Sequence, residues 1–425
     1  MISDVVLLLS QIGVILIAAR LMGWVLRTLH QPQVMGEIIA GILLGPSLLG
    51  QVAPGVSDVL FPSSSLSALN TIGNAGVLLF IFGVGLKLDL AHVWERGRAV
   101  LVIAHASIAV PLILGTGLGV YLYPFLSDTE VTPTVFALFT GVAMSVTALP
   151  VLARILEECQ LSETSIGAVA LSIAAVKDVM AWCLLAGVMA LRTYTVALDS
   201  LAVKIIAAGL FVFAILHFVP RVFHVLQEKS RPGGRLTNSI WLLMLLTMAL
   251  SAWITEKLGV HALFGAFLAG VALSKSPVMA SNALAKFESL TSTVLLPIFF
   301  ASVGLRTSFQ LIHGTQLWIY LGFILLVAVA GMWGGTTLAA RCTGMTWSES
   351  TTIGVLMNTR GLMEIVILSI GRDVGIISSI MFAMMLLMTL ITTCMTTPLL
   401  RLYPPDRVRQ TASHRLEMPD SFKQS

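Results

Sequence analysis

The adjacent residues Lys177 and Asp178 place two charges in the middle of an apolar stretch, residues 166–191, that is long enough to cross a membrane. An ionisable side chain at the centre of a bilayer costs about 2.5–3.5 kcal/mol on insertion scales. Such side chains in membrane helices usually mark an ion pathway or a proton relay. The pair therefore predicts a site that moves protons or ions.

A second apolar stretch, residues 132–156, carries hydroxyl groups beside a proline. Ser145 and Thr147 come shortly before Pro150, and a proline inside a helix removes an amide donor and clashes with the preceding turn. Broken backbone at membrane depth is tolerated where it lines a cavity or packs on protein. The two hydroxyls are therefore candidates for binding a hard monovalent ion, and helix–helix hydrogen bonding is the alternative.

A third stretch, residues 349–371, is polar in its middle, where it contains Asn358, Arg360 and Glu364. The carbonyl oxygen of Asn358 is a further candidate ligand for an ion. Arg360, Glu364 and Arg154 form a charged set with two open interpretations. They either stabilise the ends of interrupted helices, with Arg360 paired to a buried carboxylate, or have a purely structural role.

The composition is that of a polytopic helical membrane protein. Of the 425 residues, 57% are hydrophobic and 11% are charged, whereas soluble domains carry about 25% charged residues. Apolar stretches of roughly 18–25 residues recur along the chain, and this length spans a bilayer as a helix. We predict an all-α fold with about 13 transmembrane helices, near residues 4–26, 33–52, 66–86, 99–123, 132–156, 163–191, 201–226, 237–256, 259–275, 289–310, 316–340, 349–371 and 376–400.

Basic residues outside these spans fall mainly on one side of the membrane. The connections after odd-numbered spans are basic, with Lys87, Arg221 and Arg341 as examples, whereas the alternate connections hold fewer basic residues. Basic connections face the cytoplasm under the positive-inside rule. We therefore predict a bacterial inner-membrane protein with its N-terminus outside and a short cytoplasmic tail, residues 404–425.

Two segments of the chain are similar to each other. Residues 78–88 and 296–306 both contain an aromatic and apolar run, then Val-Gly-Leu and a basic residue, Lys87 or Arg306. The count of spans puts these basic residues on opposite sides of the membrane, which is typical of the inverted repeats of secondary transporters. We predict a transmembrane domain over residues 1–403, with a first repeat near 4–191, a linker helix at 201–226 and a second repeat near 237–400.

The repeats pair the two interrupted stretches with each other. The ends of interrupted helices present carbonyl groups to cations and amide groups to anions. Lys177 and Asp178 lie on the span that follows the first interruption. We therefore expect both interruptions and the charged pair to meet near the bilayer midplane.

Several ordered motifs resemble one family of transporters. The segments QVMGEIIAGILLGP (33–46), SVTALPVLAR (145–154) and NTRGLME (358–364), together with Asp178, resemble the monovalent cation:proton antiporter-2 family of the Na+/H+ exchanger superfamily. The resemblance covers nearly the whole chain. It implies the Na+/H+ antiporter fold, with two crossed broken helices, a mobile core domain and a dimerisation domain. It also implies an elevator-type exchange of Na+ or K+ for H+ by a homodimer, with Asp178 as the carrier carboxylate.

The chain departs from the family pattern at two positions. Members of the family usually have Asp, Asn or Gln where this chain has Lys177. Many also have a lysine in the eleventh helix at the position where an ungapped alignment places Met332. Three roles stay open for Lys177: a counter-charge that competes with the cation for Asp178, a group that releases its own proton, or a fixed charge that repels Na+ and K+.

The leading hypothesis is a secondary antiporter that exchanges Na+ or K+ for H+. Asp178, Lys177, Thr147, Ser145 and Asn358 would form its cation and proton site, with Asp178 binding the monovalent cation. One alternative keeps the fold but moves an organic or anionic solute, because Lys177 changes the charge of the site. Another is a membrane sensor or scaffold that does not transport.

The sequence gives no support to other classes of function. It contains no phosphate-binding loop, zinc-binding histidine pair or serine nucleophile motif, so we expect neither an enzyme nor a cofactor. The net charge of +4 follows from the basic connections and does not indicate nucleic-acid binding. The expected partners are Na+ or K+, H+, the lipid bilayer and a second copy of the chain.

Overall fold

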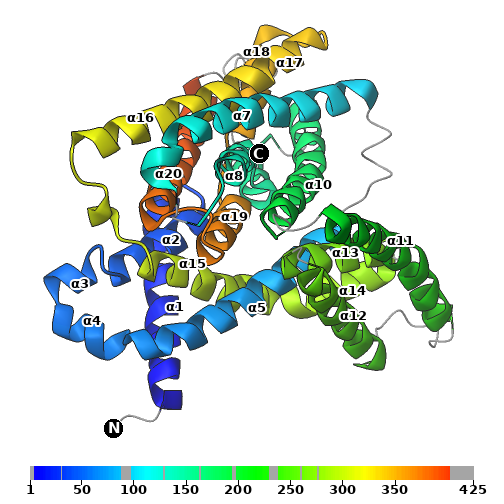
Figure 1. Cartoon of the computed structure of the whole chain (residues 1–425), viewed down its shortest axis with the longest axis horizontal. Coiled ribbons are helices and arrows are strands. Elements are labelled where there is room, and N and C mark those ends of the chain that lie inside the picture. The colour runs from blue at the N-terminus through cyan, green and yellow to red at the C-terminus, as the bar shows by residue number, and fades with distance from the viewer. Residues whose placement is uncertain are drawn as a thin grey trace, which may run out of the picture.

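The computed structural model describes residues 4–29, 31–87, 97–127, 130–161, 164–193, 198–228, 238–258, 261–274 and 277–402. These residues are almost entirely helical, apart from short connections and an isolated β-bridge between Ser127 and Ile377 (Figure 1). The all-α prediction is confirmed. The predicted tail, residues 404–425, lies outside the described residues.

The helices form two groups, which we call the scaffold group and the site group. Extensive contacts between the described helices lie within one group or the other, except that the short connector η2 (Phe309–Leu311) packs on α20. Most of the scaffold group lies in the lower half of Figure 1. It contains α1 (Asp4–Thr28), α2 (Gln33–Leu44), α3 (Leu49–Val52), α4 (Pro54–Leu60), α5 (Ser63–Lys87), α11 (Leu198–Glu228), α12 (Asn238–Lys257), α13 (Ala262–Ser274), α14 (Pro277–Leu290), η1 (Thr291–Leu295) and α15 (Leu296–Leu305).

The site group occupies the upper half of the same view. It contains α7 (Gly97–Leu126), α8 (Pro133–Ser145), α9 (Leu149–Glu158), α10 (Ser165–Thr193), α16 (Thr315–Val329), η3 (Ala330–Gly334), α17 (Gly335–Cys342), α18 (Trp347–Met357), α19 (Leu362–Asp373) and α20 (Ser379–Leu402). Apolar side chains of both groups, such as Ile81 on α5 and Phe136 on α8, belong to one buried cluster. The two groups therefore meet across a largely apolar interface.

Every predicted span has a helical counterpart. Ten helices of the described chain are long and apolar enough to cross a membrane, and the bent pair of α18 and α19 raises this to eleven. α8 and α13 are shorter apolar helices at the positions of the fifth and ninth predicted spans. The chain is a multi-pass membrane protein.

The tenth span begins earlier than predicted. Its apolar part suggested residues 289–310, whereas α14, η1 and α15 follow one another from Pro277 to Leu305. Glu288 interrupts the apolar pattern, but its side chain is half exposed and pairs with Lys87. The helix therefore continues past its apolar section, and hydropathy alone placed the boundary too late.

The first interrupted span breaks between α8 and α9. Val146 and Ala148 have extended backbone conformations, with φ and ψ of −83° and 144° and of −90° and 96°. Pro150 lies in the first turn of α9, where its missing amide costs no helical hydrogen bond. The proline thus starts the second half-helix, and the break lies just before it.

The second interrupted span breaks between α18 and α19, which are bent by 42° relative to each other. The two breaks touch, because the amide of Ala148 donates to the carbonyl of Thr359 at 3.0 Å. The hydroxyl of Thr147 also donates to the carbonyl of Met357 at 2.7 Å. Each break therefore satisfies backbone groups that the other leaves open, and this holds the crossing of the two broken helices together.

Two glycine crossings explain why the second and ninth spans are rich in glycine. A Cβ on Gly304 of α15 would lie 2.4 Å from the backbone of Gly41 on α2, and one on Gly270 of α13 would lie 2.9 Å from Gly85 on α5. Small residues let helix backbones approach closely in membranes. These contacts bind α2 and α13 into the scaffold group.

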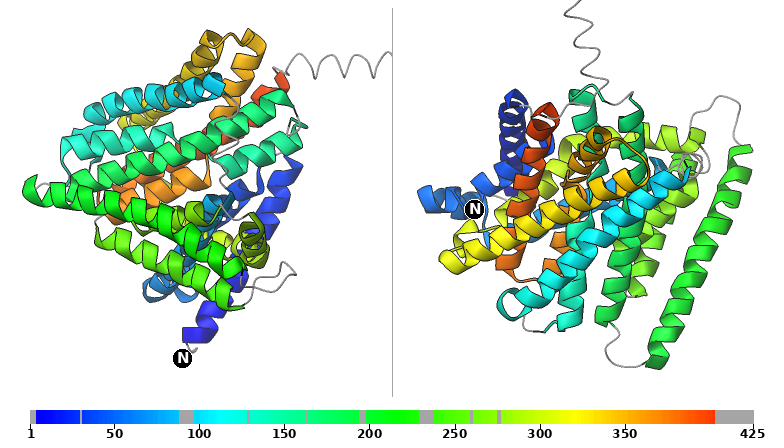
Figure 2. Two further views of the ribbon diagram at one scale, coloured as in Figure 1. Left: turned by 90° about the vertical axis from the view of Figure 1, so that its right-hand side faces the viewer. Right: turned by 90° about the horizontal axis from the view of Figure 1, so that it is seen from above.

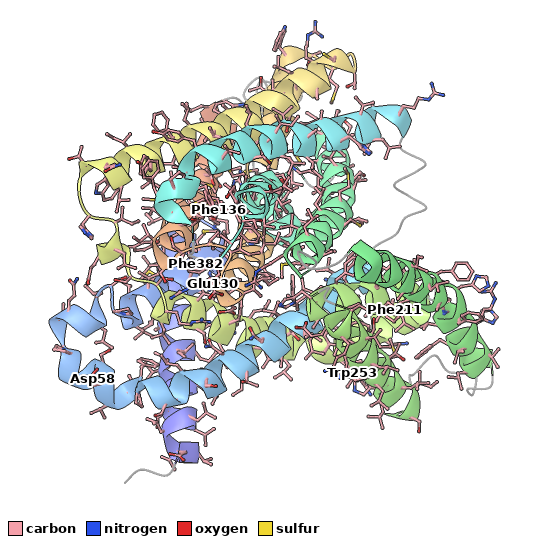
Figure 3. All side chains as sticks on the ribbon, viewed as in Figure 1. Asp58, Glu130, Phe136, Phe211, Trp253 and Phe382 are labelled. Carbon is pink, nitrogen blue, oxygen red and sulfur yellow. The ribbon has the colours of Figure 1, made fainter. Side chains whose placement is uncertain are left out.

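The outer surface is largely apolar, as a lipid-facing surface must be. α11 lies at the outer edge of the molecule in the right-hand view of Figure 2. Figure 3 shows Trp253 of α12 on the periphery, whereas Phe136 and Phe382 lie among the inner helices, and the exposures agree with this placement. The polar and charged residues of the interior are thus the exception.

Candidate functional site

Asp178 is buried and has no hydrogen-bond partner among the described residues. It lies on α10, is 2% exposed, and neither of its carboxylate oxygens accepts a hydrogen bond from a described residue. Buried polar groups are almost always hydrogen-bonded, because an unpaired one pays the full cost of its lost hydration. A carboxylate in this state is suited to take up a proton or a cation.

Asp178 lines a cavity of about 420 Å³ between the scaffold and site groups. On the site-group side, Leu149 and Ala153 of α9 and Ala175 of α10 line it with Asp178. The scaffold group contributes residues of α5, α13, α14 and η1 to the opposite wall. The cavity therefore lies where a movement between the two groups would change access to the carboxylate.

Lys177 is directed away from Asp178. Its ammonium group donates to the sulfur of Met332 on η3 at 2.9 Å and to the carbonyl of Ser107 on α7 at 3.3 Å. Neighbouring residues lie about 100° apart around a helix, which places the two side chains on different faces of α10. No ion pair joins Lys177 and Asp178 in the described chain, so the geometry is not that of a bound counter-charge.

The three neutral candidate ligands differ in how they are bonded. Ser145 donates to the carbonyl of Val142 at 2.8 Å, one turn back in α8. Thr147 donates across the crossing of the broken helices, which leaves its oxygen lone pairs available. Asn358 is buried, and neither its amide oxygen nor its nitrogen has a partner among the described residues. Asn358 therefore has both amide atoms open to an ion, while Ser145 and Thr147 each keep oxygen lone pairs. None of the three is among the described residues that line the cavity with Asp178.

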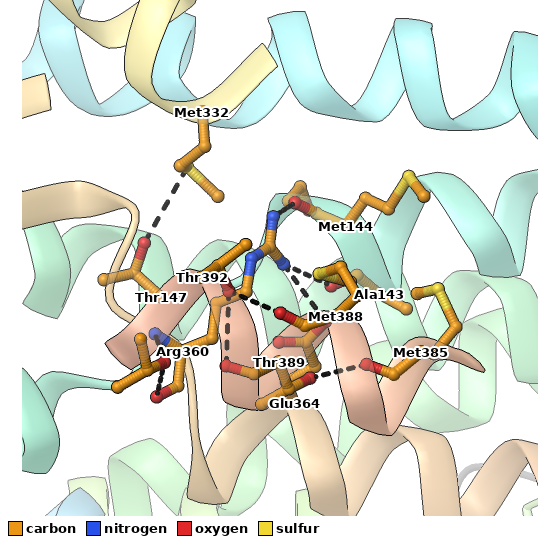
Figure 4. Close-up of polar contacts among 12 residues, drawn as sticks. Ala143, Met144, Thr147, Met332, Arg360, Glu364, Met385, Met388, Thr389 and Thr392 are labelled. Atoms are coloured by element: carbon orange, nitrogen blue, oxygen red, sulfur yellow. Dashed lines mark hydrogen bonds and ion pairs between the residues drawn. The ribbon is translucent and has the colours of Figure 1, made fainter. Parts of the chain in front are cut away.

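Arg360 and Glu364 form a fully buried ion pair beside the crossing (Figure 4). The guanidinium group lies 3.1 Å from Glu364 and also donates to the carbonyls of Met144 at 2.7 Å and Ala143 at 3.4 Å. These carbonyls belong to the last turn of α8, which carries the negative end of the helix dipole. Arg360, in the second interrupted span, thus donates hydrogen bonds to the free carbonyl groups at the C-terminal end of α8 in the first.

Arg154, the third member of the predicted charged set, is not brought to this pair. It lies on the exposed face of α9, whereas Arg360 and Glu364 are buried. The structure adds Thr393 of α20, whose hydroxyl donates to the carbonyl of Arg360 and accepts from its amide. We did not predict this contact, although a stripe of threonines at helical spacing in α20 signalled a polar face: Thr389, Thr392, Thr393, Thr396 and Thr397.

These features define a class of protein: a helical membrane transporter in which two broken helices cross beside a buried carboxylate. Residues 15–402 match the family described as sodium/hydrogen exchanger, transmembrane. The chain belongs to this family, which confirms the family predicted from the motifs.

Three similar proteins are named as cation/proton antiporters. The chain is 40% identical to cation/H+ antiporter 17 of Arabidopsis thaliana, over 96% of this chain and 50% of the relative. It is 36% identical to the Na+/H+ antiporter NhaS4 of Synechocystis, over 95% of this chain and 98% of the relative. It is 34% identical to K+/H+ antiporter 1 of Saccharomyces cerevisiae, over 98% of this chain and 48% of the relative. The chain thus spans about half the length of the plant and yeast relatives and nearly all of NhaS4.

A solved structure shares the fold. The sodium proton antiporter MjNhaP1 of Methanocaldococcus jannaschii superimposes with a TM-score of 0.65, covering 92% of this chain and 98% of its own, at 13% sequence identity. At this identity the likeness concerns the fold alone. The predicted Na+/H+ antiporter fold is confirmed.

Proposed function

We propose that the chain exchanges Na+ or K+ for H+ across the membrane by an elevator movement, with Asp178 as the carrier carboxylate. The observation that carries the proposal is that the carboxylate of Asp178 lies on the wall of the cavity and has no hydrogen-bond partner among the described residues. The family and the printed names of the relatives, which include Na+/H+ and K+/H+ antiporters, support cations and protons as substrates.

Coupling follows from the use of one carboxylate for two ligands. A proton on Asp178 removes the charge that binds a cation, and a bound cation opposes protonation, so the two occupancies alternate. Carboxylate, hydroxyl and amide oxygens suit hard monovalent ions. Thr147 and Asn358 are the residues we assign to complete the cation site.

The contacts of Lys177 favour a cation over a different solute. Its ammonium group is engaged by Met332 and Ser107, which leaves the carboxylate of Asp178 as the charge on the cavity wall at this depth. An anionic solute would meet this carboxylate first. The alternative of an organic or anionic substrate, and that of a protein that does not transport, therefore have less support.

The grouping of the helices supports an elevator. Asp178, both broken helices and their ion pair belong to the site group, and the cavity lies between this group and the scaffold group. Apolar side chains of both groups share one buried cluster, and an apolar interface permits sliding of one group along the other. We propose that this sliding carries Asp178 from one side of the membrane to the other.

We also propose a location, an orientation and an oligomeric state for the protein. The distribution of basic residues supports a cytoplasmic C-terminus, so the Lys87 end of α5 would face the cytoplasm. A bacterial relative, NhaS4, makes a bacterial inner membrane the expected location. We also propose a homodimer, by resemblance to the family.

Reconstituted protein tests the function directly. In proteoliposomes with an imposed pH gradient, addition of Na+, K+, Li+ or Rb+ should release protons when the ion is a substrate, and choline should not. We expect a response to Na+ or K+. Absence of a response to all four ions, from protein that is folded by size-exclusion chromatography and thermal unfolding, would contradict the proposal.

A further inference from the structure

Two helical stripes of the scaffold group line the cavity opposite Asp178. The first is on α5 and ends at its last residue, Lys87; its members are Phe80, Gly83, Val84 and Lys87. The second runs along α14 into η1 and consists of Leu284, Phe287, Glu288, Thr291 and Ser292. Each stripe is mainly apolar but carries one charged residue, so the charges on this wall are Lys87 and Glu288.

Lys87 and Glu288 form an ion pair at the mouth of the cavity. The ammonium nitrogen lies 2.6 Å from the carboxylate oxygen, and the side chains are 55% and 52% exposed. Asp178 is 2% exposed, so the ion pair is at the solvent end of the cavity and Asp178 at its buried end. An ion that reaches Asp178 through this mouth passes the carboxylate of Glu288.

Thr291 belongs to the buried part of the cavity wall. It is one turn beyond Glu288, is 2% exposed, and its hydroxyl has no hydrogen-bond partner among the described residues although it lines the cavity. The neighbouring hydroxyl of Ser292 instead donates to the carbonyl of Glu288 at 2.6 Å. Thr291 also begins the π-helical turn η1, and such turns occur frequently at functional sites.

We propose that Glu288 and Thr291 form an access site for the monovalent cation, in which the ammonium group of Lys87 acts as a tethered competitor. The inference rests on the proposed function, because it concerns the route to Asp178. Lys87 occupies Glu288 when no metal cation is bound there. An incoming Na+ or K+ displaces it, is held by the Glu288 carboxylate and the Thr291 hydroxyl, and passes on to Asp178.

The model of a tethered competitor gives opposite effects for the two charges. In Lys87→Gln, the carboxylate of Glu288 is free to attract cations, so the KM for the cation falls. In Glu288→Gln, the ammonium group of Lys87 is left unpaired at the mouth and repels cations, so the KM rises. We expect changes of about two- to fivefold, the range that half-exposed charge pairs produce.

The experiment measures the KM for the cation in proteoliposomes for wild type, the two single variants, the double variant Lys87→Gln/Glu288→Gln, and Thr291→Val. The double variant removes both charges and should lie near wild type, while Thr291→Val should raise the KM. The matched control is Glu157→Gln: Glu157 is an exposed carboxylate one turn beyond Ala153 on α9 and does not line the cavity. It should leave the KM unchanged.

Salt provides a second readout. Charges at an exposed mouth are screened over about 8–10 Å at 0.1–0.15 M ionic strength. Raising the ionic strength with choline chloride should therefore bring the KM values of the single variants together. A pair that only braces α5 against α14 would show no such convergence.

The possible outcomes separate this inference from the proposed function. Shifts of the same sign in Lys87→Gln and Glu288→Gln, or no shift in either, with wild-type exchange intact, would overturn the access site alone. Absence of cation-driven proton movement in the wild type would overturn the proposed function instead. Thermal unfolding of each variant shows whether a change reflects loss of folded protein.

Discussion

Asp178 and Lys177 are neighbours in the chain but belong to different environments. The carboxylate faces the cavity between the groups, whereas the ammonium group is held by Met332 and Ser107 within the site group. The positive charge of Lys177 thus reaches Met332, the residue at which the resemblance to the family led us to expect a lysine. Lys177 still repels a cation at Asp178 electrostatically, although it does not form an ion pair with the Asp178 carboxylate.

Lys177→Met should therefore strengthen cation binding. Two unit charges about 8 Å apart interact by about 2 kcal/mol at an effective dielectric constant of about 20. Loss of the repulsive ammonium group should lower the KM for Na+ or K+ by up to about thirtyfold. The measurement is the KM in proteoliposomes, and Lys177→Met/Met332→Lys, which returns a positive charge to the same place from η3, should restore the wild-type value.

A loss of exchange in folded Lys177→Met would instead show that Lys177 takes part in proton transfer. Folding itself should not suffer, because methionine has a similar volume and replaces a buried charge whose acceptors among the described residues are a thioether sulfur and a carbonyl at 3.3 Å. An unfolding midpoint at or above that of wild type is expected. This control separates an effect on the site from an effect on stability.

The sequence located the site better than it oriented its residues. The cost of burying Asp178 makes it visible in any hydropathy profile, and Pro150 marks the first break. The contact of Lys177 with Met332 joins residues 155 positions apart in the chain. The absence of hydrogen-bond partners for Asn358 among the described residues depends on how the breaks of the two interrupted spans cross. Neither contact pattern can be predicted from the spacing of residues along one helix.

At the level of elements, the crossing of the broken helices depends on Arg360. Its side chain joins Glu364 of α19 to the last carbonyls of α8, and its backbone is bonded on both sides by Thr393 of α20. Three elements therefore meet at one residue. Its loss should disturb the geometry of the crossing without touching the cation.

Arg360→Gln should destabilise the protein by about 3–5 kcal/mol, because Glu364 would be left as a buried, unpaired charge. Unfolding of the purified protein in detergent measures the effect. Glu364→Gln in the same background should recover part of the loss, since it removes the unpaired carboxylate. Additive destabilisation by the two substitutions would show that the buried pair is not a coupled unit.

At the level of the whole molecule, the cavity opens at one end of the interface between the scaffold and site groups, and an ion pair joins the two groups at the other end. The cavity opens beside Lys87 and Glu288 of the scaffold group. Arg306, the residue that follows α15, lies 18 residues beyond Glu288, about 27 Å along a nearly continuous helix at 1.5 Å per residue. There its guanidinium group contacts Asp373 of α19 at 2.7 Å, so that scaffold and site groups are joined at the end away from the cavity mouth.

A cross-link at this closed end should stop exchange. With the native cysteines Cys159, Cys183, Cys342 and Cys394 replaced by serine, Arg306→Cys/Asp373→Cys treated with a short bismaleimide would tie α15 to α19. Elevator movement requires these helices to separate, so proton flux should fall to the background level. The single-cysteine variants treated with the same reagent should keep their activity, and continued exchange by the cross-linked protein would contradict the elevator.

Hydropathy was sufficient to find the spans, but it could not find the cavity. Each predicted span has a helix, whereas α14 begins earlier than its apolar core because Glu288 hides the start of the helix. The ion pair at the mouth joins residues 201 positions apart. Such a contact follows only from the way α5 and α14 pack against each other.

The central claim is that the carboxylate of Asp178 couples the cation to the proton. Its most direct test is cation-driven proton flux in proteoliposomes containing equal amounts of folded wild type or Asp178→Asn, with Glu157→Gln as the control for loss of a carboxylate elsewhere. The amide of Asn cannot take up a proton or carry the negative charge, so we expect flux to be lost in Asp178→Asn and unchanged in Glu157→Gln. Proton flux in Asp178→Asn at the wild-type rate would contradict the account.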